Sequence, residues 1–206
     1  MIKNKRQDGF TLVELVMAMA IFSGIMLVVV AGFILVTRMY DAGITSRTTQ
    51  QNARLIVDDF AKNAHFSGKP DTVASGINTA TCLYTGSNTV VYDFYAPDGS
   101  NPQLHNLYRK LITAVTCPTP NVQPDSSWQQ INDTTVSVLV FDPQYTAGTG
   151  NGHGTETLTV TVGAISNFGL GDLLYKGNAC ISGANGSQYC SVSSLKTTVY
   201  LNGSNY

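Results

Sequence analysis

An uninterrupted apolar segment near the N-terminus constrains the fold more than any other feature of the sequence. The segment from Leu15 to Val36 contains no charged side chain. As a helix with a rise of 1.5 Å per residue it extends about 33 Å, and the hydrocarbon core of a bilayer is about 30 Å thick. It therefore predicts a membrane-spanning helix. Lys3, Lys5 and Arg6 precede it, which predicts a cytoplasmic N-terminus and an exported C-terminal body.

Two simpler interpretations of this segment are a secretory signal peptide and a signal anchor. A secretory signal peptide has a shorter apolar core that ends at small residues, where it is cut. The segment here is too long and has no such site at its end. A signal anchor remains open on the apolar segment alone, and it predicts an N-terminus that is never cut.

Glu14 lies directly before the apolar segment and needs an explanation. A carboxylate in a spanning helix costs up to about 2.5 to 3.5 kcal/mol at the bilayer centre, less near the interface, and usually has a partner. No Lys, Arg or His lies within a helical turn or two of Glu14, so we expect its partner outside its own helix. If a protease cut between Gly9 and Phe10, the new ammonium group on Phe10 would lie one helical turn from Glu14. In a stack of such helices, the ammonium group of one subunit would then meet the carboxylate of the next.

Residues 9–15, with the sequence GFTLVEL, resemble the class III signal of type IV pilins and type II secretion pseudopilins. In that family a membrane peptidase cuts after the glycine and methylates the new N-terminal phenylalanine. The resemblance implies that Gly9 ends the leader, that Phe10 is the methylated N-terminus and that Glu14 sets register and charge pairing during assembly. The close resemblance covers residues 1–68. One departure is the absence of the mid-helix proline of many major pilins.

The helical pattern continues beyond the apolar segment. Five apolar residues recur at spacings of three and four, which is typical of a helix packed on one side: Ala53, Ile56, Val57, Phe60 and Ala64. Ser67-Gly68-Lys69-Pro70 supplies a stop. We therefore predict one helix from about Thr11 to Phe66. Residues 51–68 resemble the helix end of PilW-type minor pilins and, more loosely, of J-type pseudopilins.

The sequence after Pro70 is typical of an antiparallel β-sheet. Short runs rich in β-branched and aromatic residues alternate with Gly, Pro and Asn. The expected strands are Thr89–Ala96, Leu107–Thr116, Thr135–Asp142, Thr155–Val162 and Leu195–Leu201. A helix laid across one face of this sheet gives an α+β fold. The expected layout is a leader (1–9), a transmembrane and filament-core helix (10–37), an amphipathic helix half (38–68) and a β-rich exported globular domain (69–206).

Four cysteines lie in the predicted exported body, where an even number favours disulfides. Four cysteines allow three connectivities. We favour Cys82 with Cys117 and Cys180 with Cys190, because local closure suits loop-like intervening sequence. Zinc is the competing interpretation, but no CxxC pair or Cys/His cluster is present.

Composition and motifs argue against an enzyme or a nucleic-acid-binding protein. Charged residues make up 12%, and the net charge of −1 becomes −3 without the leader, because nine basic residues then face twelve acidic ones. The clustered basic residues of a nucleic-acid surface are missing. Residues 148–154 are glycine-rich but lack the GK[ST] ending of a phosphate loop, and no GxSxG elbow occurs. We expect no catalytic residue, cofactor or resident metal, and leave a calcium site at Asp93, Asp98 and Asp125 as a minor alternative.

These features together predict a structural or assembly subunit, a minor pilin, of a type IV pilus-like filament. Its expected partners are other pilin or pseudopilin subunits, the prepilin peptidase and membrane lipid before assembly. The expected location is the inner membrane, as a single-pass protein with a cytoplasmic N-terminus, and then the pilus or cell surface. Two alternatives remain open. One is a J-type pseudopilin of a type II secretion or competence system, and the other is a signal-anchored adhesin or binding module.

Overall fold

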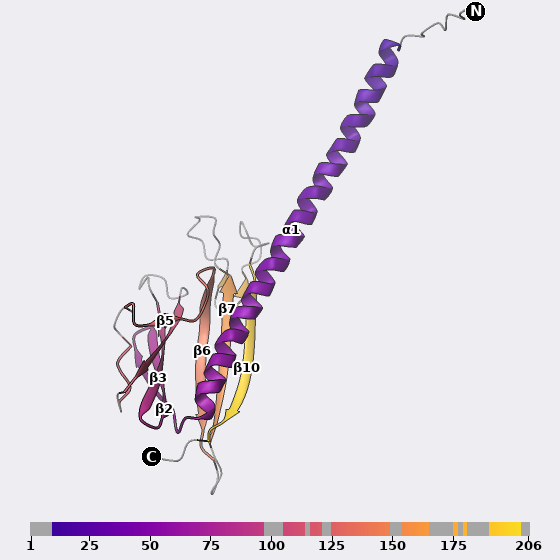
Figure 1. Cartoon of the computed structure of the whole chain (residues 1–206). Coiled ribbons are helices and arrows are strands. Elements are labelled where there is room, and N and C mark those ends of the chain that lie inside the picture. Colours follow the sequence, from indigo (N-terminus) through magenta and orange to yellow (C-terminus); the bar gives the residue numbers. More distant parts are fainter. Residues whose placement is uncertain are drawn as a thin grey trace, which may run out of the picture. The chain divides into compact units, whose positions relative to one another are not determined.

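The computed structural model consists of one long helix followed by β-strands (Figure 1). It describes residues 10–96, 105–113, 116–120, 125–148, 154–164, 175–176, 179–180 and 190–202. The chain divides into two compact units, Met1–Asp41 and Ala42–Tyr206. Helix α1 (Leu12–His65) begins in the first unit and ends in the second. Its bounds confirm the predicted helix to within one residue at each end.

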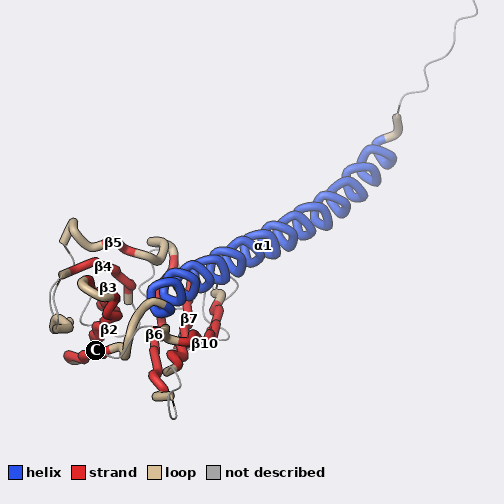
Figure 2. The backbone as a smooth tube through the Cα atoms, turned by 60° about the horizontal axis from the view of Figure 1, so that its bottom comes forward, coloured by secondary structure: helices blue, strands red, loops and turns tan. Residues whose placement is uncertain are grey.

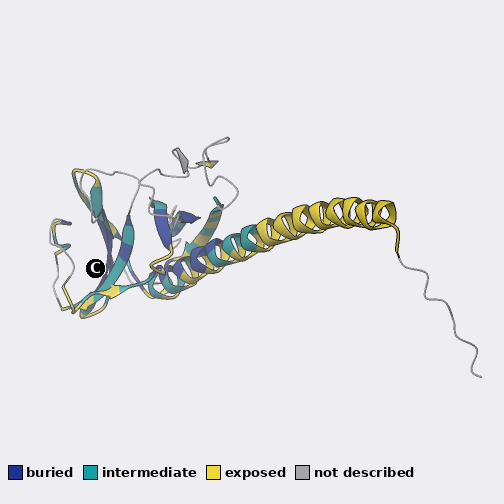
Figure 3. Ribbon diagram, turned by 90° about the horizontal axis from the view of Figure 1, so that it is seen from above, coloured by how far each residue is buried: buried dark blue, intermediate teal, exposed yellow. Residues whose placement is uncertain are grey.

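The first part of α1 buries none of its apolar surface. Every residue from Leu12 to Tyr40 is exposed (Figure 3). Two polar side chains in this part, Ser23 and Thr37, donate to the carbonyl oxygens of Met19 and Phe33, one turn earlier, at 2.8 Å in each case. Both hydroxyl groups are thus satisfied inside the helix, as an apolar surrounding requires.

The second part of α1 is amphipathic. Ala53, Ile56, Phe60 and Ala64 are fully buried, and Val57 is partly buried against the same core. The predicted stripe is therefore confirmed. Asn52 extends it by one polar position, since its side-chain oxygen accepts a hydrogen bond from the backbone N–H of Asp133 at 2.9 Å.

The first sheet has five antiparallel strands in the order β1-β2-β3-β4-β5. The strands are β1 (Asp71–Ser75), β2 (Asn78–Thr85), β3 (Asn88–Tyr95), β4 (Asn106–Ile112) and β5 (Gln129–Gln130). Two-residue loops join β1 to β2 and β2 to β3. Each begins with a glycine of positive φ, 62° at Gly76 and 63° at Gly86, and neither Ile77 nor Ser87 has a positive φ. This pattern fits type II′ turns.

A second antiparallel sheet has the order β10-β7-β6, and a third pairs β8 with β9. Their strands are β6 (Val136–Thr146), β7 (Thr155–Ala164), β8 (Tyr175–Lys176), β9 (Ala179–Cys180) and β10 (Val192–Tyr200). Figure 2 separates the two larger sheets. The α+β class is confirmed, but the expectation of one sheet is wrong. Strand β6 pairs with β7 instead of continuing the ladder of β5.

The second part of α1 and both larger sheets share one apolar core. Phe60 lies at its centre, with ring centroids 5.3 Å from Tyr92 and 5.7 Å from Phe141. From β7 come Leu158 and Val160, both fully buried. In the first half of β7 buried and partly buried residues alternate, so one set of side chains faces the core.

Polar contacts align α1 with β10. Near one end of the strand, the hydroxyl groups of Thr49 and Ser191 lie 3.0 Å apart. At the other end, the His65 ring lies 3.2 Å from the carbonyl oxygen of Tyr200, and the backbone N–H of Asn202 donates to the carbonyl of His65. The helix therefore runs in the same direction as β10.

A polar cluster links the helix to the five-stranded sheet. Asp59 forms an ion pair with Arg109 on β4 and accepts a hydrogen bond from the Tyr92 hydroxyl at 2.8 Å. Asn63 donates to the same hydroxyl at 2.7 Å. Burial, with the charge of Asp59 beside it, raises the pKa of Tyr92 far above its usual value, so the phenol stays protonated.

Candidate processing and assembly site

A capping box closes the N-terminal end of α1. Thr11 precedes the first helical residue, and Glu14 is the third residue of the helix. The backbone N–H and the hydroxyl of Thr11 donate to Glu14 Oε2 at 2.9 and 2.8 Å. The Thr11 hydroxyl in turn accepts from the backbone N–H of Glu14 at 3.3 Å. This is the reciprocal arrangement of a T-x-x-E box, which satisfies backbone donors that a helix start leaves free.

Glu14 has a neutral partner that the sequence argument did not consider, since that argument looked only for cations. Thr11, three residues earlier, supplies two donors. The expected cationic partner from outside the helix stays a prediction. The T-x-x-E spacing was a signal in the sequence that would have identified this contact.

The capping box leaves the charge of Glu14 without a cation. Both hydrogen bonds use Oε2, and the described residues place no Lys or Arg in an ion pair with this carboxylate. Its surroundings on the helix are apolar, because Leu12, Val13 and Leu15 are all exposed large hydrophobic residues. A positively charged group from outside this chain can therefore still gain from approaching the site.

The two residues of the predicted cut lie at the edge of the described chain. Phe10 is 90% exposed and precedes the capping box. Gly9 lies outside the described residues. A peptidase that reached this bond would meet Phe10 before the first turn of α1, and cleavage would leave the Thr11–Glu14 contacts in place because none of them uses residues 1–9.

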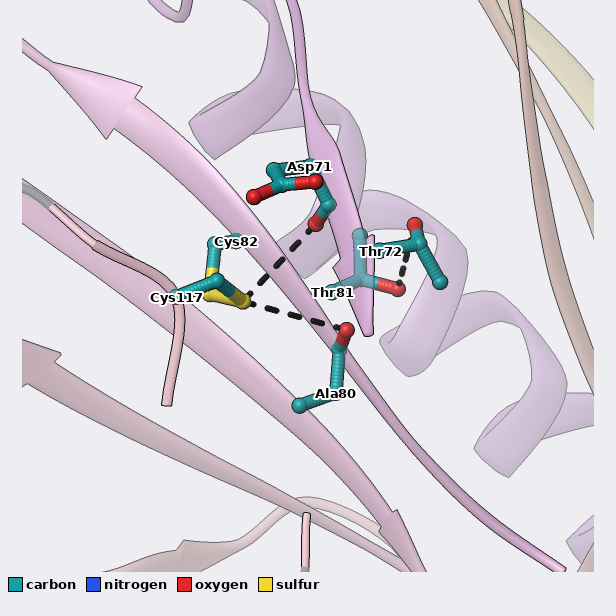
Figure 4. Close-up of a disulfide and its surroundings, with 6 residues drawn as sticks. All are labelled: Asp71, Thr72, Ala80, Thr81, Cys82 and Cys117. Carbon is teal, nitrogen blue, oxygen red and sulfur yellow. Dashed lines mark hydrogen bonds between the residues drawn. A yellow bond between two sulfur atoms is a disulfide. The ribbon is translucent and has the colours of Figure 1, made fainter. Parts of the chain in front are cut away.

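Two disulfides join the four cysteines. Cys82 pairs with Cys117, with Cα atoms 5.7 Å apart, and Cys180 pairs with Cys190, with Cα atoms 5.9 Å apart. These are the two pairs that the sequence analysis favours. Figure 4 shows the Cys82–Cys117 bond beside β1, where the Cys117 sulfur lies 3.9 Å from the carbonyl oxygens of Asp71 and Ala80.

Other residues considered as sites have structural contacts. Asp125 is exposed and accepts hydrogen bonds from the backbone and hydroxyl of Ser127. Asp93 is buried, and Asp98 lies outside the described residues, as does most of the 148–154 loop. Within the described ranges, no three His, Cys, Asp or Glu side chains gather as metal ligands would. Trp128 packs on the back of the five-stranded sheet, with Lys110 5.5 Å from its ring centroid.

Comparison with known proteins bears directly on the N-terminal segment. Residues 4–34 match the model of the prokaryotic N-terminal methylation motif. The match supports the type IV pilin and pseudopilin superfamily, and it points to a structural subunit rather than to an enzyme. No curated protein and no solved structure is significantly similar to the chain.

The apolar part of α1 fits a membrane anchor. It contains an 18-residue window with a mean hydropathy of 2.7, none of which is buried. The matched motif and this helix together fit a membrane-anchored, pilin-like subunit.

Proposed function

We propose that this chain is a minor pilin: a low-copy subunit of a type IV pilus-like filament that inserts through the first part of α1. It is made with a nine-residue leader, cut after Gly9 by a prepilin peptidase and methylated on Phe10. Before assembly it is held in the inner membrane as a single-pass protein with a cytoplasmic N-terminus. It then becomes part of a filament at the cell surface.

One observation carries the proposal: Glu14, inside the matched methylation motif, lies in the first turn of a helix whose next turns have no partner in the described part of this chain. From Leu12 to Tyr40 the helix is exposed, so its apolar surface is stable only in lipid or against other apolar helices. Glu14 is hydrogen-bonded but, among the described residues, has no cation. A stack of cleaved subunits supplies both missing elements, namely apolar neighbours and the Phe10 ammonium group.

The helix end and the added sheets support the minor role. Residues 51–68 resemble the helix end of PilW-type minor pilins, and the second unit adds its own sheets and two disulfides to that helix. A J-type pseudopilin of a type II secretion or competence system shares the same N-terminal features. Recovery of the protein in filaments sheared from the cell surface supports the pilus. Its absence there, together with failed secretion or DNA uptake on deletion, supports a pseudopilin.

The decisive measurement is mass spectrometry of the N-terminal peptide of the native protein. A peptide that begins with methylated Phe10 supports the proposal, and a Gly9→Glu variant should then accumulate with its leader intact. A native chain that begins at Met1 overturns it. That outcome favours the alternative of another class, a signal-anchored adhesin or binding module that never enters a filament.

A second experiment separates the charge of Glu14 from its hydrogen bonds. Glu14→Gln keeps an oxygen that accepts from Thr11 but removes the charge, so we expect processing to continue and incorporation into filaments to fall about tenfold or more. Glu14→Asp, which keeps the charge on a shorter side chain, is the matched control and should retain more incorporation than Glu14→Gln. Equal incorporation of native and Glu14→Gln subunits removes the proposed role of the charge.

A further inference from the structure

Glu156 occupies a position where the sheet is otherwise apolar. It lies on β7, two residues before Leu158 and four before Val160, so all three side chains share the face that packs into the core. Leu158 and Val160 are fully buried, and Glu156 is only 1% exposed. The period of two thus places an acid in the layer between the three-stranded sheet and α1.

The neighbours of Glu156 on the sheet do not provide a counter-charge. Its cross-strand partners are Tyr145 on β6 and Val199 on β10, and both pack against the apolar core. One carboxyl oxygen, Oε2, is buried without a hydrogen-bond partner among the described residues. A buried carboxylate in such surroundings is costly, whereas the neutral acid is tolerated much better.

The register of β7 and β10 places Glu156 near the C-terminal end of α1. Val199 adjoins Tyr200, whose carbonyl oxygen lies beside His65, the last residue of α1. Glu156 is therefore level with the C-terminal end of the helix. The carbonyl groups of Ala64 and His65 at this end accept hydrogen bonds from the backbone N–H groups of Ser67 and Asn202, and as acceptors they cannot hydrogen-bond to a carboxylate.

The charged groups of the two neighbouring strands lie on the other face of the sheet. Asp142 on β6 and Lys196 on β10 both pair with Thr159, whose side chain alternates with that of Glu156, and both are exposed. From β6 the only titratable group that shares the face of Glu156 is Tyr145.

The titratable groups of α1 are also engaged elsewhere or exposed. Asp59 forms an ion pair with Arg109, whose side chain extends from β4 toward the helix. Lys62 and His65, in the last turn, are exposed, and the His65 ring contacts the Tyr200 carbonyl. Burial raises the pKa of Glu156 to about 7, with no charged partner contributing.

We propose that Glu156 is a proton-dependent latch: as a neutral acid it keeps the start of β7 packed beneath the end of α1, and loss of its proton loosens that contact. Because the folded protein holds this proton more tightly than the unfolded chain, the contribution of Glu156 to stability is fully present in acid. Stability falls as pH rises from the ordinary pKa of 4.5 through about 7, and is then level. This is the reverse of ordinary acid denaturation.

The test is thermal unfolding of the full chain in detergent micelles, with Glu156→Gln as the variant and Asp142→Asn as the matched control. The amide of Glu156→Gln is neutral at every pH. We expect the Tm of the native protein and of Asp142→Asn to fall by about 5 to 10 °C between about pH 5 and pH 8. In Glu156→Gln most of this fall should be absent. Burial also raises the pKa of Asp93, to about 6, so this group contributes to the pH dependence of every variant. The readout is therefore the difference between the Tm-against-pH profiles of the native protein and Glu156→Gln.

A second measurement covers the case in which Glu156→Gln does not fold. In the native protein, part of the infrared band of protonated carboxylic acid should persist above the pKa of about 6 of Asp93 and disappear only as pH rises through about 7. At the same time, amide exchange at the start of β7 should increase more than base catalysis alone explains. Parallel Tm profiles for native and Glu156→Gln proteins, or a carboxylate already ionised near pH 5, overturn the proposal.

Discussion

The two parts of α1 belong to one continuous helix but are stabilised in different ways. From Leu12 to Tyr40 the helix is apolar around its circumference and exposed throughout. From residue 42 to His65 it has one buried stripe, with Ile56 and Phe60 fully buried, and mostly polar residues elsewhere. The second part therefore obtains its stability from packing within the chain, while the first must obtain it from outside.

The comparison shows that exposure has opposite meanings in the two parts. An exposed apolar residue in the second part, such as Leu55 at 58%, is an isolated surface residue. An exposed apolar residue in the first part, such as Ile25 at 56%, belongs to a continuous surface that needs lipid or sister helices. Similar fractional exposures thus predict different consequences of substitution.

The largest expected effect tests the packed part of the helix. Phe60→Ala removes the side chain at the centre of the core and should lower the free energy of unfolding by about 3 to 5 kcal/mol. Leu55→Ala, on the exposed side of the same helix, should change it by less than about 0.5 kcal/mol. Chemical denaturation of the full chain in micelles measures both. Similar losses from the two variants would contradict the assignment of the buried stripe.

The next prediction tests whether membrane association of the first unit is independent of the stability of the second unit. Cys82→Ala combined with Cys117→Ala opens a loop with a sequence separation of 35 residues and should destabilise the second unit by about 3 to 4 kcal/mol. Fractionation of cells should still find the variant in the membrane. A chain that loses membrane association together with the disulfide would show that the two units are not independent.

An acidic residue placed on each part of the helix should affect membrane insertion only in the first part. Ile25→Asp should cost about 3 kcal/mol near the centre of a spanning helix and reduce insertion into the membrane. Leu55→Asp, a residue of similar exposure, should leave insertion unchanged. Alkaline extraction of membranes distinguishes inserted from peripheral protein. Full insertion of Ile25→Asp would argue against the first part as the membrane anchor.

The smallest expected effect concerns the start of the helix. Thr11→Ala removes the capping box and should destabilise the first turn by about 1 kcal/mol, seen as faster amide exchange over residues 12–15 in micelles. Thr11→Ser keeps the hydroxyl and should restore most of the protection. If Thr11→Ala exchanges as slowly as the native chain, the capping contacts do not stabilise this end.

The sequence predicted α1 well because it carries two strong signals. One is an apolar run of membrane length, and the other is a stripe of apolar residues at spacings of three and four. The strands with the richest β-branched and aromatic content were also predicted, and appear as β3, β4, β6, β7 and β10. Strands β1 and β2 and the two-residue strands β5, β8 and β9 were missed. Strand β1 has only five residues, most of them small, and the apolar run of β2 is limited to Cys82, Leu83 and Tyr84. The Gly86-Ser87 pair between β2 and β3 was a usable hairpin signal.

Other features could not be read from local sequence. The division into separate sheets depends on which strands pair across long connections. The alternation of residues within one strand does not indicate which other strand pairs with it. Glu156 followed the expected alternation, but alternation alone could not show that its face is dry at that point. That conclusion needed the end of α1 above it and the side chains of Tyr145 and Val199 beside it.

The shared direction of α1 and β10 has a mechanical consequence. The helix is held near one end of the strand by Thr49 and near the other by His65, with the buried stripe between them. A pull on the helix along its axis therefore loads these contacts in shear, all at once, instead of peeling them apart one after another. A subunit drawn out of a membrane by its N-terminal segment would carry its folded body with it under tension.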